Sequence, residues 1–285
     1  MIAVGLAGWG DHEELYGAGV PARDKLKAYS RYFCNVEVDS SFYAVHKAEL
    51  YARWASETPD GFSFIVKAYQ GMTGHLRGGH SFEDDETMYR AFNESIAPLR
   101  QAGKLKSVLF QYPPWFGCDR TNVALLRAAK KRMDGIPVAL EFRHQSWFEG
   151  GMKERTLAFM KREGWGHSIC DEPQVFPGSV PTVLRATDDK LTIVRFHGRN
   201  ASAWSGGGAQ NWREVRYLYR YSDDELAGWA DDLTKLESDT EEICVLFNNN
   251  SGGDAAANAL TFMKLLGMDT KPAPPRQIDL FEDLP

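Results

Sequence analysis

The sequence has few cysteines, and they form no recognisable pair. Cys34, Cys118, Cys170 and Cys244 are scattered over 285 residues without a Cys-x-x-Cys motif. Three of them lie in or near apolar segments expected to be strands. This distribution argues against a disulfide framework and a cysteine zinc site, and it indicates reduced, buried thiols in a cytoplasmic protein.

Excess positive charge and long apolar runs are also missing. The chain has 33 Lys and Arg against 39 Asp and Glu, a formal net charge of -6, so contact with nucleic acid needs a local basic patch. No run approaches the ~20 apolar residues of a membrane-spanning helix. The segment 1–5 lacks the basic region and apolar core of a signal peptide. We therefore expect no membrane partner.

Common cofactor and metal motifs are absent as well. No Gly-x-Gly-x-x-Gly follows the first predicted strand, and no Gly-Lys-Ser/Thr loop occurs. The seven histidines show no His-x-x-x-His spacing, and only His144 and His197 come at the ends of predicted strands. We expect neither a cofactor nor a metal ion.

The chain does contain a regular alternation of strand and helix patterns. Eight predicted strands that alternate with helices over about 250 residues favour a single (β/α)8 TIM barrel of the α/β class over an open doubly wound sheet. The barrel domain is expected over 1–268, with Thr121 and Ser222 as helix N-caps. The predicted strands cover 2–8, 35–43, 62–68, 107–111, 137–142, 166–170, 192–197 and 242–247. The predicted helices cover 23–33, 48–56, 82–101, 121–133, 153–162, 223–236 and 255–266.

The second predicted strand, 35–43, places unusual groups on one face. Its two valines share one face, and Glu37, Asp39, Ser41 and Tyr43 share the other. Other predicted strands also end in polar residues, and barrel active sites lie at these C-terminal ends. We therefore expect one polar mouth, although a salt-bridged interior that only completes the core would give the same pattern. The further strand-end residues are Lys67, Gln111, Glu141, Arg143, His144, Asp171, Arg195, His197, Asn248 and Asn249.

Several of these segments resemble motifs of the YecE-like family, also called domain of unknown function 72. The resemblance runs in order from about 4 to 266 and implies a (β/α)8 barrel without a settled activity. It departs from the family at Asp39, where the family has Asn, and at 73–75, where Thr-His is lengthened to Thr-Gly-His. The segments that carry it are 8–9, 36–43, 58–62, 64–68, 109–114, 141–147, 195–198 and 247–249, together with Trp54.

The chemistry of the mouth points to an anionic substrate. A desolvated Lys67 near Arg143 and Arg195 could attack a carbonyl as a free amine, or it could be held in an ion pair by Glu37 or Glu141. The candidate acid and base residues are Glu37, Asp39, Glu141 and Asp171, beside Lys67 as the candidate nucleophile. The candidate substrate-binding residues are Trp9, Tyr43, Gln111, Arg143, His144, Trp147, Arg195, His197, Asn248 and Asn249.

Two long loops and the C-terminal tail carry further candidate binding features. Loops 70–80 and 199–221 are long, and the second mixes arginines with aromatics, which suits phosphates and bases, or packing among its own aromatic rings. The segment 269–285 is a Pro-rich tail whose Gln277-Ile278-Asp279-Leu280-Phe281 resembles a bacterial sliding-clamp-binding motif. Gln277, Leu280 and Phe281 would contact the clamp, or the tail would dock on its own barrel.

Three functions are compatible with these features. The first is a metal-independent enzyme acting on a nucleic-acid or nucleotide-like anionic substrate, in its most specific form a clamp-recruited DNA base-excision glycosylase and abasic-site lyase. The second is a hydrolase, lyase or isomerase acting on a phosphorylated or acidic sugar. The third is a non-catalytic module tethered to the clamp.

Overall fold

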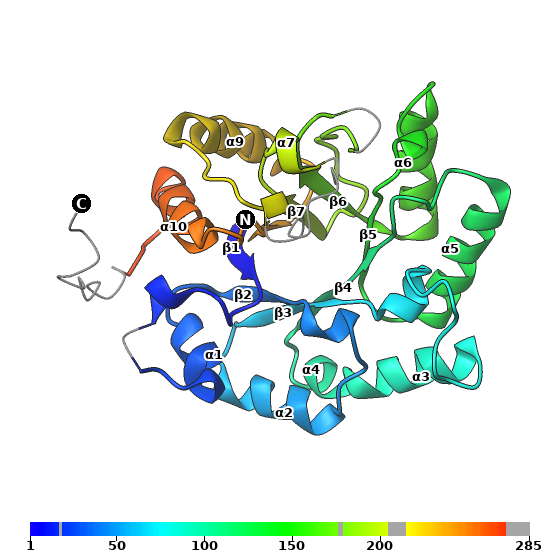
Figure 1. Ribbon diagram of the computed structural model, residues 1–285, viewed down its shortest axis with the longest axis horizontal. Helices are drawn as coiled ribbons and strands as arrows, with labels where there is room; N and C mark the ends of the chain where they lie inside the picture. The colour runs from blue at the N-terminus through cyan, green and yellow to red at the C-terminus, as the bar shows by residue number, and fades with distance from the viewer. Residues whose placement is uncertain (17–18, 176–178, 205–214, 272–285) are drawn as a thin grey trace.

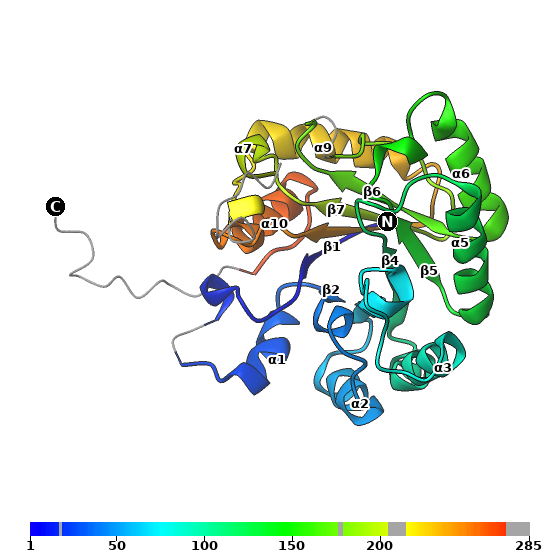
Figure 2. The ribbon, with the colours of Figure 1, turned by 45° about the vertical axis from the view of Figure 1, so that its right-hand side comes forward.

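The computed structural model describes residues 1–16, 19–175, 179–204 and 215–271. Its strands are parallel and close into a barrel in chain order, with the first strand paired to the last, as the sequence predicts. Figures 1 and 2 show the helices outside the strands. The strands are β1 (Ile2–Ala7), β2 (Asn35–Val38), β3 (Ser63–Lys67), β4 (Leu105–Gln111), β5 (Val138–Glu141), β6 (Gly166–Asp171), β7 (Leu191–Phe196) and β8 (Glu242–Phe247).

The helices follow the predicted pattern with three corrections. The helix expected over 82–101 is two helices, because Pro98 cannot supply the backbone N–H that would continue the first. The helix expected over 23–33 is shorter, and Asp119 rather than Thr121 caps its helix by accepting from Asn122 N at 2.8 Å. The helices are α1 (Lys25–Tyr29), α2 (Ala48–Glu57), α3 (Asp85–Ser95), α4 (Ala97–Gln101), α5 (Arg120–Arg132), α6 (Met152–Glu163), α7 (Ala201–Trp204), α9 (Asp223–Leu236) and α10 (Asp254–Leu265).

Alternation along each strand separates two cores. Val36, Val38 and Val66 face outward and join the large core between the barrel and the helices. Ile65, Leu109 and their neighbours face inward and form a small apolar layer within the barrel. The inward-facing residues nearer the C-terminal strand ends are polar, so the polar site lies directly above an apolar floor. That floor consists of Ala3, Ile65, Leu109, Ala139, Ile193, Cys244 and Leu246.

The segment after β2 does not continue as a strand. It turns into a 3-10 helix, η3 (Ser40–Phe42), which ends the alternation of faces predicted through Tyr43. Ser41 is buried and donates to the carbonyls of Val38 and Lys67 at 2.6 and 2.7 Å. Tyr43 is instead 72% exposed. The turn therefore brings Phe42, rather than Tyr43, beneath the ammonium of Lys67, which lies 5.0 Å from the ring centre.

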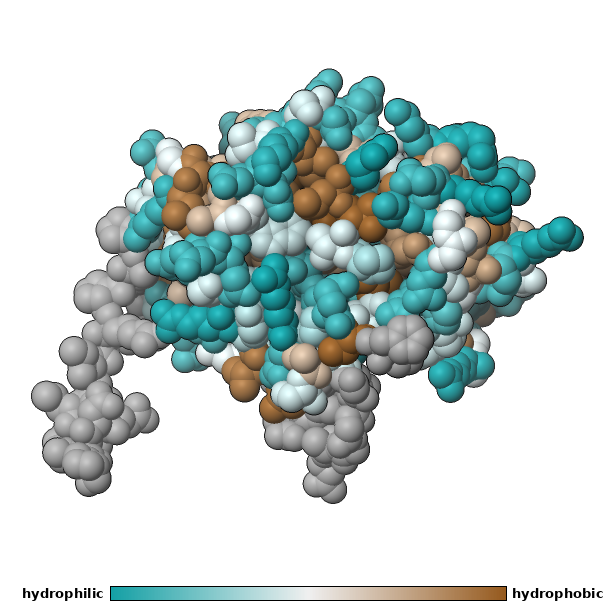
Figure 3. Space-filling model, turned by 90° about the horizontal axis from the view of Figure 1, so that it is seen from above, coloured by the Kyte–Doolittle hydropathy of each residue, from teal (hydrophilic) through white to brown (hydrophobic). Residues whose placement is uncertain are grey.

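The outer surface is mixed in character. Hydrophilic residues cover most of the face seen in Figure 3, with separate hydrophobic areas between them. No helix in the described ranges is both long and apolar enough to cross a membrane.

Ser222 caps α9 as predicted, in a capping box with Glu225.

Candidate active site at the barrel mouth

Arg195 is the centre of the polar layer. It lies on β7, is fully buried, and donates to both carboxylate oxygens of Glu37 on β2, at 2.6 and 2.9 Å. Its third nitrogen donates to Glu141 on β5 at 2.9 and 3.1 Å and to Gln111 Oε1 at 3.3 Å. Arginine suits this position because its planar fork binds two carboxylates at once.

A second arginine extends the network on the β5 side. Arg143 Nε donates to Glu141 Oε1 at 2.7 Å, and its Nη1 donates to Glu172 Oε2 at 2.6 Å. Burial opposes the ionisation of Glu141, but Arg143 and Arg195 outweigh it and hold its pKa well below the usual range. Glu141 is therefore a fixed anion that orients both arginines, and it is poorly suited to accept a proton during a reaction.

His197 completes this layer as a neutral ring. Arg143 donates to its Nε2 at 2.7 Å, so the ring proton lies on Nδ1, which faces the Asn248 amide at 3.0 Å. The amide must then turn its oxygen towards Nδ1. Burial and the two arginines hold the pKa of His197 well below its usual range. The lone pair of His197 is thus used within the protein.

Lys67 lies nearer the opening than the arginines. Its Nζ is 3.0 Å from Asp39 Oδ1, and the two side chains are 13% and 36% exposed. Asp39 in turn interacts with Glu37, which is fully buried. The partner of Lys67 is therefore Asp39, and not Glu37 or Glu141 as the ion-pair alternative expected.

The surroundings shift the pKa values of Lys67, Glu37 and Asp39 in different ways. Burial lowers the pKa of Lys67, but Asp39 and Glu37 outweigh it, so the pKa is raised and the resting group is an ammonium. Burial raises the pKa of Glu37 to about 8 against the opposing effect of Arg195, and Asp39 adds to the rise. Burial disfavours the Asp39 anion, yet Lys67 and Arg195 lower its pKa. Two neighbouring carboxyls with pKa values driven apart are the arrangement that supplies an acid and a base.

Asp171 belongs to a separate ion-pair cluster on the β6 side. Both of its oxygens accept from Arg199 Nε at 3.0 Å, and Arg199 Nη1 donates to Glu225 at 2.9 Å. Burial raises the pKa of Asp171, which Tyr221 and Arg199 partly oppose. This cluster joins the end of β6 to the start of α9. The structure therefore separates Asp171 from the Lys67 group with which the sequence analysis placed it.

One set of side chains in the described residues has donor atoms close enough to hold a metal ion: Glu141, Cys170 and His197. All three are buried. Arg143 and Arg195 already donate to Glu141, and Arg143 takes the lone pair of His197 Nε2. Guanidinium groups thus occupy the positions from which a cation would be held, and the donor set does not fit a metal.

Several predicted binding residues are used for structure. Trp147 is buried, stacks on Phe142 at 4.0 Å and donates to the carbonyl of Phe116. His144 caps a short 3-10 helix, and Trp9 packs edge-on against Trp54. Asn249 is buried and donates to Tyr219 O and to Asn258 Oδ1. Of the predicted set, the structure joins these in the central network: Glu37, Asp39, Lys67, Gln111, Glu141, Arg143, Arg195, His197 and Asn248.

Other predicted residues lie outside the described ranges, and some site residues were missed. Residues 205–214 of the predicted loop 199–221 lie outside, as do Gln277, Leu280 and Phe281. In the described part of that loop, Arg216 lies 4.1 Å from the Trp204 ring centre, and Trp204 also contacts Arg143. The missed residues are Phe42, His75, Ser168, Glu172 and Arg199; of these, Glu172 was signalled by following Asp171 at the end of a strand.

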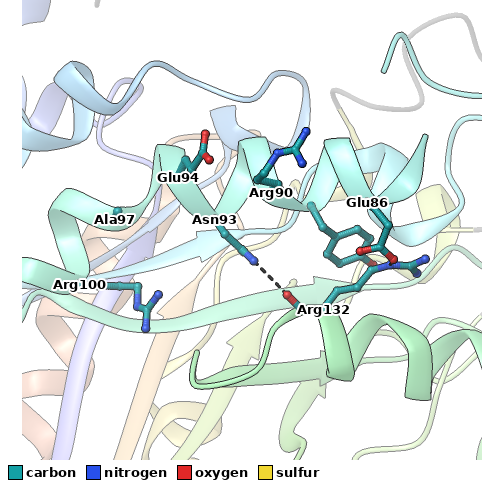
Figure 4. Close-up of a pocket in the computed structure, with 8 residues that line it drawn as sticks. Glu86, Arg90, Asn93, Glu94, Ala97, Arg100 and Arg132 are labelled. Atoms are coloured by element: carbon teal, nitrogen blue, oxygen red, sulfur yellow. Dashed lines mark hydrogen bonds and ion pairs between the residues drawn. The ribbon is translucent and has the colours of Figure 1, made fainter. Parts of the chain in front are cut away.

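A groove on the outer wall is distinct from the mouth. It encloses about 410 Å³ where α3 and α4 pass the end of α5 (Figure 4). Arg132 pairs there with Glu86 at 2.6 Å, and Asn93 donates to the Arg132 carbonyl at 3.0 Å. These charges already have partners within the groove. Its lining residues are Glu86, Tyr89, Arg90, Asn93, Glu94, Ala97, Arg100 and Arg132.

Fold and site together define a (β/α)8 barrel with an ion-paired polar mouth. The chain belongs to the DUF72 family of proteins of unknown function, whose model matches residues 3–279. The UPF0759 protein YunF of Bacillus subtilis is 54% identical over 282 residues, covering 99% of this chain and all of YunF. YecE of Escherichia coli K12 is 28% identical over 157 residues, 55% of this chain and 54% of YecE.

Solved structures of the family share the same architecture. A DUF72 protein of Enterococcus faecalis superposes with a TM-score of 0.90 at 35% identity, covering 98% of this chain and 100% of its own. A DUF72 protein of Thermotoga maritima gives a TM-score of 0.80 at 31% identity, covering 94% and 99%. These relatives establish family and fold without a named reaction.

Proposed function

We propose that this protein is an enzyme that binds a nucleotide-like anionic substrate at the barrel mouth, with Lys67 as its reactive cation. The observation that carries the proposal is the partly exposed Lys67–Asp39 pair, placed above the buried Glu37. An ammonium at the opening attracts a phosphate or carboxylate group. The carboxyl pair behind it can take up the proton that Lys67 releases.

The proposed proton path runs from the opening into the barrel. Asp39 is the group in contact with Lys67, and Glu37, whose pKa is raised to about 8, is in contact with Asp39. A proton leaving Lys67 passes to Asp39, and Glu37 buffers the pair near neutral pH. Arg143 and Arg195 supply the positive field without a metal ion.

Aromatic groups around Lys67 suit a planar substrate part. Phe42 lies beneath the ammonium, and the exposed Tyr43 ring contacts Phe42 edge-on at 5.2 Å. Trp115 is 49% exposed, and Arg77 lies 4.3 Å from its ring centre. Exposed rings beside cations bind unstacked bases and phosphates. A base in duplex DNA would have to flip out to enter.

The most specific form of the proposal is an abasic-site lyase with glycosylase activity. Lys67, once deprotonated, attacks the aldehyde carbon of the opened sugar. The new C–N bond forms as the carbonyl oxygen takes up protons and leaves as water, which gives an imine. Borohydride reduces the C=N bond and makes the adduct permanent.

The test is borohydride trapping on a DNA duplex with one abasic site. We expect an adduct from the wild type, none from Lys67→Ala, and a normal amount from Lys235→Ala, whose lysine lies in a surface ion pair with Asp232. Absence of an adduct from the wild type overturns the Schiff-base form.

The second candidate is a small-molecule enzyme acting on a phosphorylated or acidic sugar. The limited exposure of Lys67, 13%, favours a substrate small enough to enter the mouth without base flipping. We expect this form to turn over phosphorylated aldoses or sugar acids equally well with and without residues 269–285. DNA binding at low salt by the intact chain, with no turnover of these sugars, argues against it.

We propose a separate role for the C-terminal segment. Gln277, Leu280 and Phe281 match a bacterial sliding-clamp-binding motif and follow a Pro-rich segment beyond α10. In a binding assay with purified bacterial clamp, Phe281→Ala is expected to lose binding at least about tenfold, with Asp283→Ala as the matched control. If Phe281→Ala binds the clamp as well as the wild type does, the clamp-binding role is excluded. If the wild type binds the clamp but shows no catalysis, the protein is a non-catalytic module tethered to the clamp.

The state of the cysteines supports a location for the protein. All four are free thiols, which suits a reducing compartment. We therefore propose the cytoplasm, where a clamp and DNA are both available.

A further inference from the structure

His75 stands beside Lys67 at the mouth. Its ring packs edge-on against Phe42 at 4.8 Å, and Phe42 also lies under the Lys67 ammonium. On its outer side His75 meets Trp115 at 6.0 Å. One aromatic residue therefore connects the proposed reactive cation with a half-buried histidine on the neighbouring loop.

The loop holds His75 in one position. The 3-10 helix η4 (Gln70–Thr73) ends at Gly74, whose φ of 73° is a left-handed conformation that favours glycine. The chain then reverses, and the backbone N–H of His75 donates to Gln70 O at 3.2 Å. The residue inserted between Thr73 and His75 is thus the one that makes this turn.

A hydroxyl group orients the ring. Thr73 Oγ1 lies 2.8 Å from His75 Nδ1 and 3.4 Å from Gln70 O. In the tautomer with the ring proton on Nδ1, the hydroxyl accepts from Nδ1 and donates to Gln70 O, and the lone pair lies on Nε2. A proton-accepting role for His75 requires this tautomer. No described residue bonds to Nε2. The other mouth histidine, His197, differs because Arg143 occupies its lone pair.

We propose that His75 is the proton acceptor of this site, and that it removes a proton from a substrate carbon or hydroxyl next to the group bound at Lys67. This inference rests on the proposed function for its substrate. In the lyase form, Nε2 takes the proton from the carbon beside the imine, the C–H electrons form a C=C bond, and the adjacent C–O bond breaks with phosphate leaving.

The charges around the ring keep it unprotonated, which makes its lone pair available at neutral pH while lowering its strength as a base. Burial and the nearby Lys67 and Arg143 lower the pKa of His75 to about 4, so the ring is neutral at physiological pH. Arg77 lies 4.3 Å from the ring centre of Trp115, which His75 also contacts, and Asp39 is paired to Lys67. The imidazolium formed by proton uptake is therefore surrounded mainly by cations and returns its proton readily.

The first test is acylation of the intact protein by diethyl pyrocarbonate, resolved by peptide mass spectrometry. The reagent attacks an accessible histidine lone pair. We expect His75 to react at a rate that changes less than about twofold between pH 7.5 and 5.5, whereas N-acetylhistidine slows about tenfold because its pKa is near 6.5. In Lys67→Met, which removes a smaller cause of the shift than burial, the pH below which the rate at His75 falls should rise. An unreactive His75, or one that follows N-acetylhistidine, overturns the proposal.

The second test separates this inference from the proposed function. In abasic-DNA trapping, His75→Gln should still form the Lys67 adduct, but strand cleavage should slow about 100-fold or more. Cleavage at the wild-type rate overturns the role of His75 and leaves Lys67 in place. If the wild type forms no adduct while His75 shows the expected acylation, the lyase function fails and the exposed lone pair is confirmed.

Discussion

Arg195 and Glu37 form a two-pronged ion pair across the barrel, with nitrogen–oxygen distances of 2.6 and 2.9 Å, although 158 positions separate them in the chain. Both side chains are fully buried. Glu141 shares the same arginine, so one cation holds two carboxylates above the apolar floor. The mouth is therefore rigid at its base and open near Lys67.

Removing Arg195 should destabilise the fold strongly. Arg195→Gln removes the main counter-charge of the buried Glu37 and one of the two arginines that pair with Glu141, so the free energy of unfolding should fall by about 3–5 kcal/mol. Urea denaturation measures this. Lys235→Gln, which breaks the exposed pair with Asp232, is the control and should change the value by less than about 1 kcal/mol. Equal stabilities of Arg195→Gln and the wild type would contradict the role of Arg195 as a stabilising counter-charge for the buried carboxylates.

Asp39 should control the protonation of Lys67. In Asp39→Asn the main charge that opposes burial is gone, so the pKa of Lys67 should fall and its amine should be acylated at lower pH. Competitive labelling with acetic anhydride, resolved by mass spectrometry, measures the shift. The exposed Lys235 should label identically in both proteins. If the pH at which Lys67 is labelled does not change, Asp39 is not its controlling partner.

Stability should decrease in mild acid because buried histidines stay neutral in the fold. Burial lowers the pKa of His12 to about 4, against 6.5 in the unfolded chain. The contribution of His12 is therefore complete above pH 6.5 and is lost as pH falls towards 4, with a slope of up to about 1.4 kcal/mol per pH unit. Urea unfolding at several pH values should show a smaller slope for His12→Gln, which can keep a bond to Gly8 O. An unchanged slope would show that His12 does not contribute to the loss of stability in mild acid.

The cap of α5 offers a simple test of local structure. Asp119 accepts from the backbone N–H of Asn122, so Asp119→Ala should lower the free energy of unfolding by about 1 kcal/mol. Thr121, the residue that the sequence pattern favoured, lies inside the helix, and Thr121→Ala should have little effect. Thermal denaturation distinguishes the two variants. A larger loss from Thr121→Ala would reverse the assignment of the cap.

Strand periodicity was sufficient to predict much of the site. Because side chains alternate along a strand, Glu37, Glu141 and Arg195 could be assigned to one face and to the C-terminal end of the barrel before any contact was known. The same rule did not extend past Val38, where the chain turns into a 3-10 helix. Periodicity alone therefore placed Tyr43 beside the site, where the structure brings in Phe42.

The sequence by itself determined the barrel, its order of elements and the polar character of its mouth, because these follow from local periodicity and from the count of strand–helix units. Only the tertiary structure decided which cation meets which carboxylate. The stagger of neighbouring strands and the lengths of the side chains direct Arg195 to Glu37 and Lys67 to Asp39, and they bring His75 against Phe42. These distances join residues remote in sequence, so no pattern along the chain records them.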